Sequence, residues 1–142
     1  MSAGGSVLEG GCGTARNLIK AAGPYPRARL YGVDLSSMML HSASASVARR
    51  GLQHRIDLQY GDATSFDARA IFGVAMFDRI FMSYALSMMP AWQLALHHAL
   101  SLLAPHGSLH VVDFGSCERL PVAFKRALDE ELQRMESFLN LV

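Results

Sequence analysis

Hydrophobic residues in this chain occur in short runs that are separated by segments with helical periodicity. Five runs predict β-strands, at residues 7–9, 29–34, 55–60, 77–84 and 108–114. The run at 77–84 is almost continuously apolar, which is typical of a strand buried on both faces, whereas 55–60 alternates like an edge strand. Helices are predicted at residues 14–22, 36–50, 90–103 and, as a long amphipathic segment, 120–141.

Turn and capping residues support these boundaries. Gly23 and Pro24 end the first predicted helix, because glycine is favoured just past a helix C-terminus and proline cannot continue the helix. Ser36 or Ser37 can cap the second helix, and Gly51 closes it.

The alternation of strands and helices predicts the fold class. It indicates right-handed βαβ units, and therefore an α/β, Rossmann-like, doubly wound and mostly parallel sheet of about five strands. No internal repeat or second domain is visible, so residues 1–142 are expected to form a single domain. Ligands of such sheets bind beyond the carboxyl ends of the strands, and the predicted strand ends carry Glu9, Asp34, Asp62 and Ser83.

Composition narrows the class of protein. The formal net charge is +1 and no basic tract occurs, so nucleic acid is not an expected partner. Apolar residues make up 51% of the 142 and no apolar run reaches membrane-spanning length, as in a globular domain. Cys12 and Cys117 lack a CxxC spacing and no signal peptide is visible, so a cytoplasmic location is expected. The histidines have no metal-ligand spacing, and no metal site is expected.

The segment Glu9-Gly10-Gly11-Cys12-Gly13-Thr14 joins the first strand to the first helix through a glycine-rich turn. A strand, a glycine turn and a helix bring backbone N–H groups and a helix N-terminus up to a small ligand. A dinucleotide fingerprint would need a third glycine where Arg16 stands, which argues against NAD or FAD. The alternative is S-adenosylmethionine, which needs close backbone approach, an acid for its ribose hydroxyls and a group that reads the adenine edge.

On these motifs the chain resembles the class I S-adenosylmethionine-dependent methyltransferases over residues 7–115. The turn at 9–14 is similar to their first motif, and Asp34 to the acid that binds ribose at the end of their second strand. Gly61-Asp62-Ala63 is similar to the signature whose aspartate side chain and following N–H contact adenine, and 103–109 to the turn into their fifth strand. The resemblance implies S-adenosylmethionine as the cofactor and the strand order 3-2-1-4-5.

The resemblance also implies a set of site residues. The residues expected to bind the cofactor are Glu9, Gly11, Cys12, Gly13, Asp34, Leu35, Met39, Gly61, Asp62, Ala63 and Ser83. Ser83 and Tyr84 stand at the end of the fourth strand, where the transferred methyl group should point, and are the expected catalytic residues. Structural roles stay open as alternatives, since the glycines can form a simple tight turn, Asp34 can cap a helix and Met39 can belong to the core.

Trp92 and Asp113 have alternatives of the same kind. Tyr84 and Trp92 can hold a methylated ammonium group by cation–π contact, or Trp92 can be a core residue. Asp113 ends the fifth predicted strand, and it has either a functional or a structural role there.

A closer resemblance concerns the methyl acceptor. Residues 13–18, 77–92 and 109–115 are similar to the bacterial betaine-lipid N-methyltransferases, which methylate the amine of diacylglycerylhomoserine. This implies a lipid-headgroup amine as acceptor and at most peripheral contact with the inner membrane. The same motifs also serve other small-molecule acceptors, and a non-catalytic cofactor-binding remnant is the third hypothesis.

The chain departs from the family pattern at several places. Gly10 replaces a hydrophobic residue and should loosen the end of the first strand, Ala15 replaces a glycine, and His106 replaces a glycine in the later turn. The family normally has a helical segment before the first strand and a sixth and a seventh strand, so the chain is expected to be a fragment, a mis-started product or a degenerate member. An unpaired edge on the fifth strand would favour a homodimer.

Overall fold

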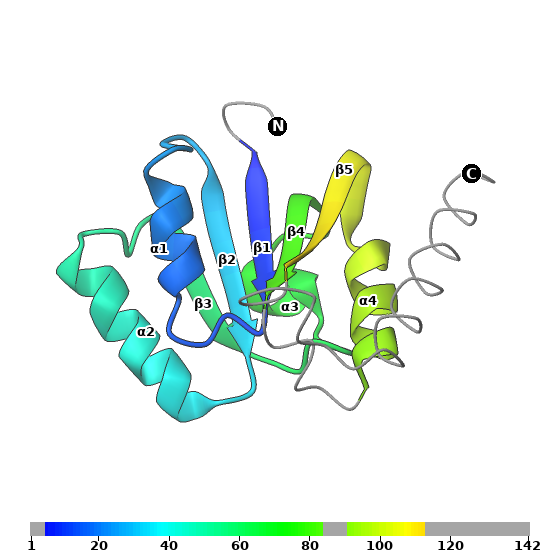
Figure 1. Cartoon of the computed structure of the whole chain (residues 1–142), viewed down its shortest axis with the longest axis horizontal. Coiled ribbons are helices and arrows are strands. Elements are labelled where there is room, and N and C mark those ends of the chain that lie inside the picture. Colours follow the sequence, from blue (N-terminus) through cyan, green and yellow to red (C-terminus); the bar gives the residue numbers. More distant parts are fainter. Residues whose placement is uncertain (1–4, 84–90, 113–142) are drawn as a thin grey trace.

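The computed structural model of the protein describes residues 5–83 and 91–112, which form a parallel sheet with helices on both faces (Figure 1). The strands are β1 (Ser6–Gly10), β2 (Arg29–Asp34), β3 (Ile56–Tyr60), β4 (Phe77–Ser83) and β5 (Leu103–Val112). The helices are α1 (Arg16–Ala22), α2 (Ser37–Arg49), α3 (Ala68–Phe72) and α4 (Trp92–Ser101). The described strands have the order β3-β2-β1-β4-β5 and pair in parallel throughout, which confirms the predicted fold class and strand order. Tyr84, Asp113 and the predicted helix at 120–141 lie outside the described residues.

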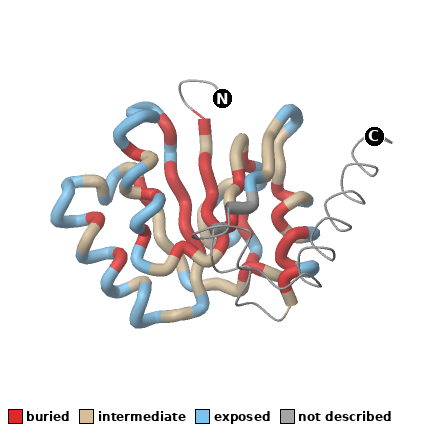
Figure 2. The backbone as a smooth tube through the Cα atoms, viewed as in Figure 1, coloured by how far each residue is buried: buried red, intermediate tan, exposed pale blue. Residues whose placement is uncertain are grey.

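The two faces of the sheet pack against different helices. Leu18 and Ala22 of α1 and Val47 of α2 form a core cluster with one face of the sheet. Helices α3 and α4 cover the other face, and Figure 2 shows buried strands between helices whose outer sides are exposed. Because β1 lies at the centre, successive residues are buried on opposite faces: Val7 packs toward α1 and Leu8 packs toward α4.

Helix α2 has the caps that the sequence predicted. Ser36 is the N-cap residue, and its hydroxyl oxygen accepts a hydrogen bond of 3.1 Å from the backbone N–H of Met39. Gly51 follows the helix with φ +68°, a left-handed conformation that glycine adopts without strain. Helix α1 begins at Arg16, two residues later than predicted, because Ala15 itself is left-handed at φ 66°.

The short helix α3 was not predicted. Its five residues are too few to show a helical period, but its two ends carry signals. The carboxylate of Asp67 accepts a hydrogen bond of 3.1 Å from Ala70 N–H, and Gly73 ends the helix at φ 72°. Asp67 and Gly73 are typical residues for the start and the end of a helix, and together they could have identified α3 from the sequence.

Strand β5 differs from the prediction of a turn at 105–107 followed by a strand from 108. It already begins at Leu103, and its pairing with β4 shifts where Phe77 faces Leu103 and Arg79 faces Ser108. The extra residues on β5 bulge out of the strand, and His106 adopts φ 68° there. Gly107 is required in the bulge, since an added Cβ would lie 2.8 Å from the carbonyl oxygen of Ala104.

Gly10 does not loosen the end of β1, and that expectation was wrong. The residue pairs with Val33 of β2 on one side and with Met82 of β4 on the other. A Cβ at Gly10 would lie 3.1 Å from Cε of Met82. The long Met82 side chain therefore occupies the space that a hydrophobic residue at position 10 would fill.

Replacing His106 by glycine should stabilise the protein. His106 is exposed and left-handed, and a non-glycine residue in this conformation costs about 1 kcal/mol. We expect His106→Gly to raise the melting temperature by about 3 °C in calorimetry.

His54→Gly is the matched control for this substitution. His54 is also exposed, but it does not have a positive φ, so glycine there should only increase the entropy of the unfolded chain. The strain at His106 would be disproved if both variants lost stability to the same extent.

Candidate functional site

The register of the sheet brings the predicted site residues to one edge. Gly10 is level with Val33 and with Met82, so Asp34 and Ser83 each lie one residue further along, on either side of the glycine turn. Asp34 is in turn level with Tyr60, after which Gly61 and Asp62 follow. The carboxyl ends of four neighbouring parallel strands therefore gather the acids and glycines that the sequence singled out.

The glycine turn is held by hydrogen bonds to the end of β2. The backbone N–H groups of Gly11 and Cys12 both donate to the carbonyl oxygen of Val33, at 2.8 and 3.0 Å. The N–H of Gly13 donates to Oδ2 of Asp34 at 2.8 Å. The expectation that these N–H groups face a ligand is therefore wrong, because all three are bonded within the protein. A ligand can still approach the backbone closely at Gly11 and Gly13, which both have positive φ and no side chain.

Asp34 connects three segments through its carboxylate. In addition to the bond from Gly13, its Oδ1 accepts a hydrogen bond of 2.8 Å from the N–H of Ser36. The helix cap itself is Ser36, so Asp34 does not have the capping role that was its alternative. The Asp34 side chain is half-buried, and each carboxylate oxygen can accept a further hydrogen bond. Asp34 can therefore accept bonds from a pair of hydroxyl groups.

Glu9 lies below the turn and not at its surface. Its side chain is 1% exposed, and Nδ2 of Asn17 donates to its Oε2 at 3.1 Å. A carboxylate buried this deeply requires hydrogen-bond donors, and Asn17 brings one from α1. The sequence analysis missed Asn17. Asn17 could have been recognised as a polar side chain in the first turn of the helix that follows the strand carrying Glu9.

Cys12 fills space inside the turn. Burial is the main cause that raises the pKa of its thiol far above the usual range, and the negative charges of Glu9 and Asp34 raise it further. The thiol therefore stays protonated and packs as a small apolar group. Its neighbour is Gly32 of β2, where an added Cβ would lie 2.8 Å from Cys12 Sγ and 2.8 Å from Leu18 Cδ1.

The loop after β3 is also attached to β2. The N–H of Gly61 donates to the backbone oxygen of Asp34 at 3.1 Å, and a Cβ at Gly61 would lie 2.8 Å from Cγ2 of Val33. Oδ1 of Asp62 accepts bonds from the N–H and the hydroxyl of Thr64, at 2.9 and 2.8 Å, and these bonds lower the pKa of Asp62. Ala63 is buried beside this carboxylate. Asp62 is thus an ionised turn residue whose other oxygen, Oδ2, is an acceptor at the sheet edge.

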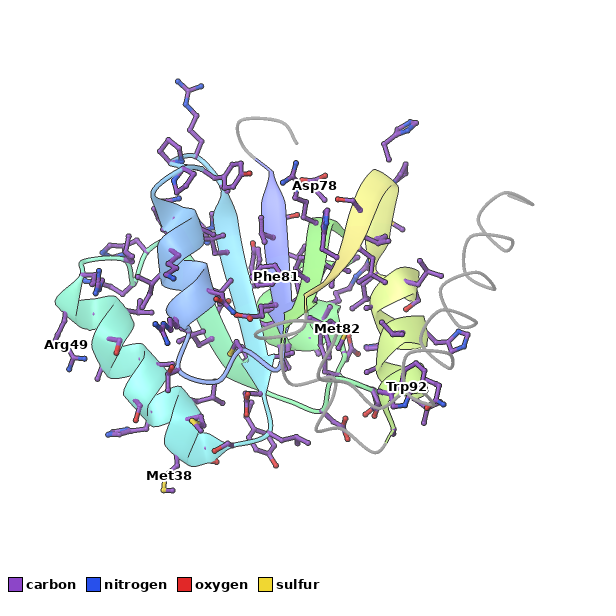
Figure 3. All side chains as sticks on the ribbon, in the orientation of Figure 1. Met38, Arg49, Asp78, Phe81, Met82 and Trp92 are labelled. Carbon is purple, nitrogen blue, oxygen red and sulfur yellow. The ribbon has the colours of Figure 1, made fainter. Side chains whose placement is uncertain are left out.

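Exposed apolar side chains surround Asp34. Leu35 is 55% exposed, Met39 47% and Tyr60 59%, so Met39 does not belong to the core. Figure 3 shows the neighbouring Met38 extending outward at the start of α2. Exposed large apolar groups next to a carboxylate are suited to the flat rings of a ligand. Tyr60 was missed by the sequence analysis, although it directly precedes the motif at Gly61.

The remaining predicted residues lie elsewhere or outside the described part. Trp92, the first residue of α4, is 7% exposed and belongs to the core cluster on the α3 and α4 side of the sheet, which supports its core interpretation. Ser83 ends β4 beside the turn, but its side chain is not among the described ones. Within residues 5–83 and 91–112 there is no group of three side chains that could hold a metal ion, and no helix that could cross a membrane.

Replacing Gly32 by alanine should displace the glycine turn. The new methyl group would overlap Cys12 Sγ and Leu18, and forcing an extra carbon into a packed core costs about 2 kcal/mol. We expect Gly32→Ala to lower the melting temperature, and Cys12→Ala in the same chain to restore part of it.

Gly23→Ala is the control for this prediction. Gly23 has φ −68°, and the nearest atom to an added Cβ is 3.9 Å away, so alanine should be tolerated there. If Gly32→Ala melted like Gly23→Ala, the close contact between β2 and the turn would not exist.

Comparison with known proteins agrees with this geometry. A family model described as "Methyltransferase domain" matches residues 7–107. Among solved structures, the cyclase SpnF superposes with a TM-score of 0.68 and 28% identity over 76% of this chain and 38% of its own length. YcgJ from Bacillus subtilis superposes with a TM-score of 0.67 and 27% identity, over 78% of this chain and 44% of its own.

A third structure shows the same fold at lower identity. This structure is coclaurine N-methyltransferase bound to N-methylheliamine and SAH (S-adenosylhomocysteine). It superposes with a TM-score of 0.66 and 22% identity, over 78% of this chain and 31% of its own length. The chain thus spans less than half the length of these three proteins. Since the family model covers most of the chain, including the glycine turn, Asp34 and Asp62, the protein belongs to the methyltransferase domain family.

Proposed function

We propose that the protein is an S-adenosylmethionine-dependent methyltransferase. The observation that carries this proposal is the Asp34 carboxylate, which is anchored to the glycine turn and still has lone pairs for two hydroxyl groups. The turn has no N–H group left for a phosphate at Gly11, Cys12 or Gly13, which favours a ligand without one. The resemblance to class I enzymes and the SAH bound to coclaurine N-methyltransferase agree with this choice.

Each described group has a role in this proposal. Asp34 binds the ribose hydroxyls, and the backbone at Gly11 and Gly13 allows the methionine part to approach closely. Asp62 and the N–H of Ala63 read the adenine edge, while exposed apolar side chains contact the adenine faces; these are Leu35, Met39 and Tyr60. Glu9 and Asp34 place negative charge near the turn, which suits a sulfonium cation.

The reaction demands little acid–base chemistry of the protein. The cofactor supplies an electrophilic methyl group, which an acceptor receives by in-line displacement while the C–S bond breaks and its electron pair stays on sulfur. The residues of the chain orient the two reactants and exclude water. Ser83 ends β4 on the side of the turn opposite Asp34. We propose that Ser83 and the next residue in the sequence, Tyr84, face the methyl group. An amine acceptor must lose its proton, to water or to Tyr84, because only the neutral amine is a nucleophile.

For the acceptor we propose an amine, and specifically the headgroup amine of a lipid such as diacylglycerylhomoserine. The support is the resemblance to betaine-lipid N-methyltransferases, which residues 81–92 and 109–115 carry. Another small-molecule acceptor and a non-catalytic cofactor-binding protein are the alternatives. The cyclase SpnF shares this fold, so the fold alone does not specify methyl transfer.

The ribose assignment is tested by calorimetry with S-adenosylhomocysteine and its 2′-deoxyribose analogue. The wild-type protein should bind S-adenosylhomocysteine, and Asp34→Ala should weaken this binding about 100-fold because it removes two bonds to a charged acceptor. If Asp34→Ala only loosened the turn, the binding of both ligands would weaken equally. If Asp34 binds the ribose hydroxyls, the wild-type protein should bind S-adenosylhomocysteine more tightly than the 2′-deoxyribose analogue, and Asp34→Ala should bind the two equally.

Asp57→Ala is the control for the loss of an acid. The Asp57 carboxylate accepts its bond from Gln59 within β3, away from the turn. Its removal should leave the affinity for S-adenosylhomocysteine unchanged. If wild type failed to bind the ligand, or if Asp34→Ala kept the preference for the natural sugar, the assignment of Asp34 would be refuted.

The acceptor is tested with radiolabelled S-adenosylmethionine. We expect transfer to diacylglycerylhomoserine in mixed micelles and not to a panel of small amines and phenols. The initial rate should rise with pH while the acceptor ammonium loses its proton. Transfer to a small amine or phenol in preference to the lipid would overturn the lipid proposal but keep the methyltransferase.

A further inference from the structure

Positive charge is distributed very unevenly along this nearly neutral chain. Residues 11–55 contain seven lysine and arginine residues and a single carboxylate, Asp34, so this segment carries a formal charge of +6. The whole chain carries only +1. Neither α1 nor α2 contains an acidic residue. The outer layer formed by these two helices is therefore a cationic surface on a protein with almost no net charge.

The cations of this layer gather in a groove between the two helices. The groove has a volume of about 420 Å³, and its lining residues are Thr14, Arg16, Ile19, Lys20, Ser46, Arg49 and Arg50. Figure 3 shows Arg49 on the outer side of α2, pointing away from the sheet. All four cationic residues are exposed, and no ion pair with a described carboxylate is found for them. We call this the α1–α2 groove.

Helix stability explains only part of this cluster. Arg49 and Arg50 lie at the C-terminal end of α2, where a cation interacts favourably with the helix dipole. Arg16 is the first residue of α1, where a cation is unfavourable, and no acidic residue in the first turn compensates it. Lys20 lies in the last turn of α1, where a cation is favourable, but it also adds a like charge one turn away from Arg16. Helix stability therefore does not explain Arg16, which points to a ligand.

The chemistry of the groove indicates which ligand. Arginine guanidinium groups donate in pairs to phosphate oxygens, and lysine adds a point charge. Nη2 of Arg49 donates to the Ser46 hydroxyl at 3.0 Å, and that hydroxyl keeps its own hydrogen to donate. The lining residues include no aromatic side chain on which a nucleic acid base could stack. We propose that the α1–α2 groove binds a phosphate group, held by Arg16, Lys20, Arg49 and Arg50.

The phosphate group can belong to a free phosphorylated molecule or to the headgroup of an anionic lipid. In either case the groove is distinct from the cofactor site, where Glu9 and Asp34 give the opposite charge. Thr14 links the two, since it follows Gly13 in the glycine turn and also lines the groove. A molecule anchored by its phosphate would therefore lie beside the turn.

The test measures binding of two probes to the full chain. Inorganic pyrophosphate is titrated by calorimetry, and phosphatidylcholine vesicles with and without phosphatidylglycerol are used in cosedimentation. Arg49→Gln with Arg50→Gln, and separately Arg16→Gln with Lys20→Gln, should weaken binding at least about tenfold. Binding should also weaken as salt increases. Arg27→Gln with Arg69→Gln removes the same charge from exposed residues outside the groove and should change binding little.

Each outcome has a defined meaning. Binding of pyrophosphate that depends on the groove assigns a free phosphorylated ligand, and binding of phosphatidylglycerol vesicles alone assigns a lipid headgroup. If neither probe binds, or if the control pair loses as much affinity as the groove pairs, the proposal is wrong. S-adenosylhomocysteine binding, measured on the same variants, should stay unchanged, which separates this site from the proposed cofactor site.

Discussion

The carboxyl end of β2 must hold two loops at once, and the rest of the site depends on this constraint. Val33 and Asp34 accept hydrogen bonds from the N–H groups of Gly11, Cys12, Gly13, Ser36 and Gly61. The glycine turn after β1 and the loop after β3 are thereby attached to the same two residues. Asp34 cannot be removed without loosening the turn, so a binding residue is also a structural one.

Close packing also holds the two loops against the sheet. Gly32 leaves room for Cys12 and Leu18, and Gly61 leaves room for Val33. At both places a single added methyl group would overlap a neighbouring side chain. The loops are therefore held against the sheet by contact as well as by hydrogen bonds, so that the acids they carry keep a fixed position. A site built on such contacts is preorganised for its ligand.

The two sides of α1 differ in charge. On the side facing the sheet, Glu9 and Asp34 lie near the glycine turn and suit a cationic ligand. On the outer side, Arg16 and Lys20 line a cationic groove with α2. One short helix thus separates a region that tolerates a sulfonium from a region suited to phosphate. This arrangement permits a substrate whose reactive group and charged group are recognised at different places.

The sequence by itself determined the fold class, the order of the elements and the positions of Asp34 and Asp62, because period, turn chemistry and strand ends are local properties. It did not show α3, which is too short for a period, or the bulge in β5, whose register depends on β4. Only the tertiary structure decided that the turn's N–H groups bond to β2, since their acceptors lie more than twenty residues away in the chain. The groove between α1 and α2 likewise needed the packing of two helices, because residues 16–20 and 46–50 become neighbours only in the folded protein.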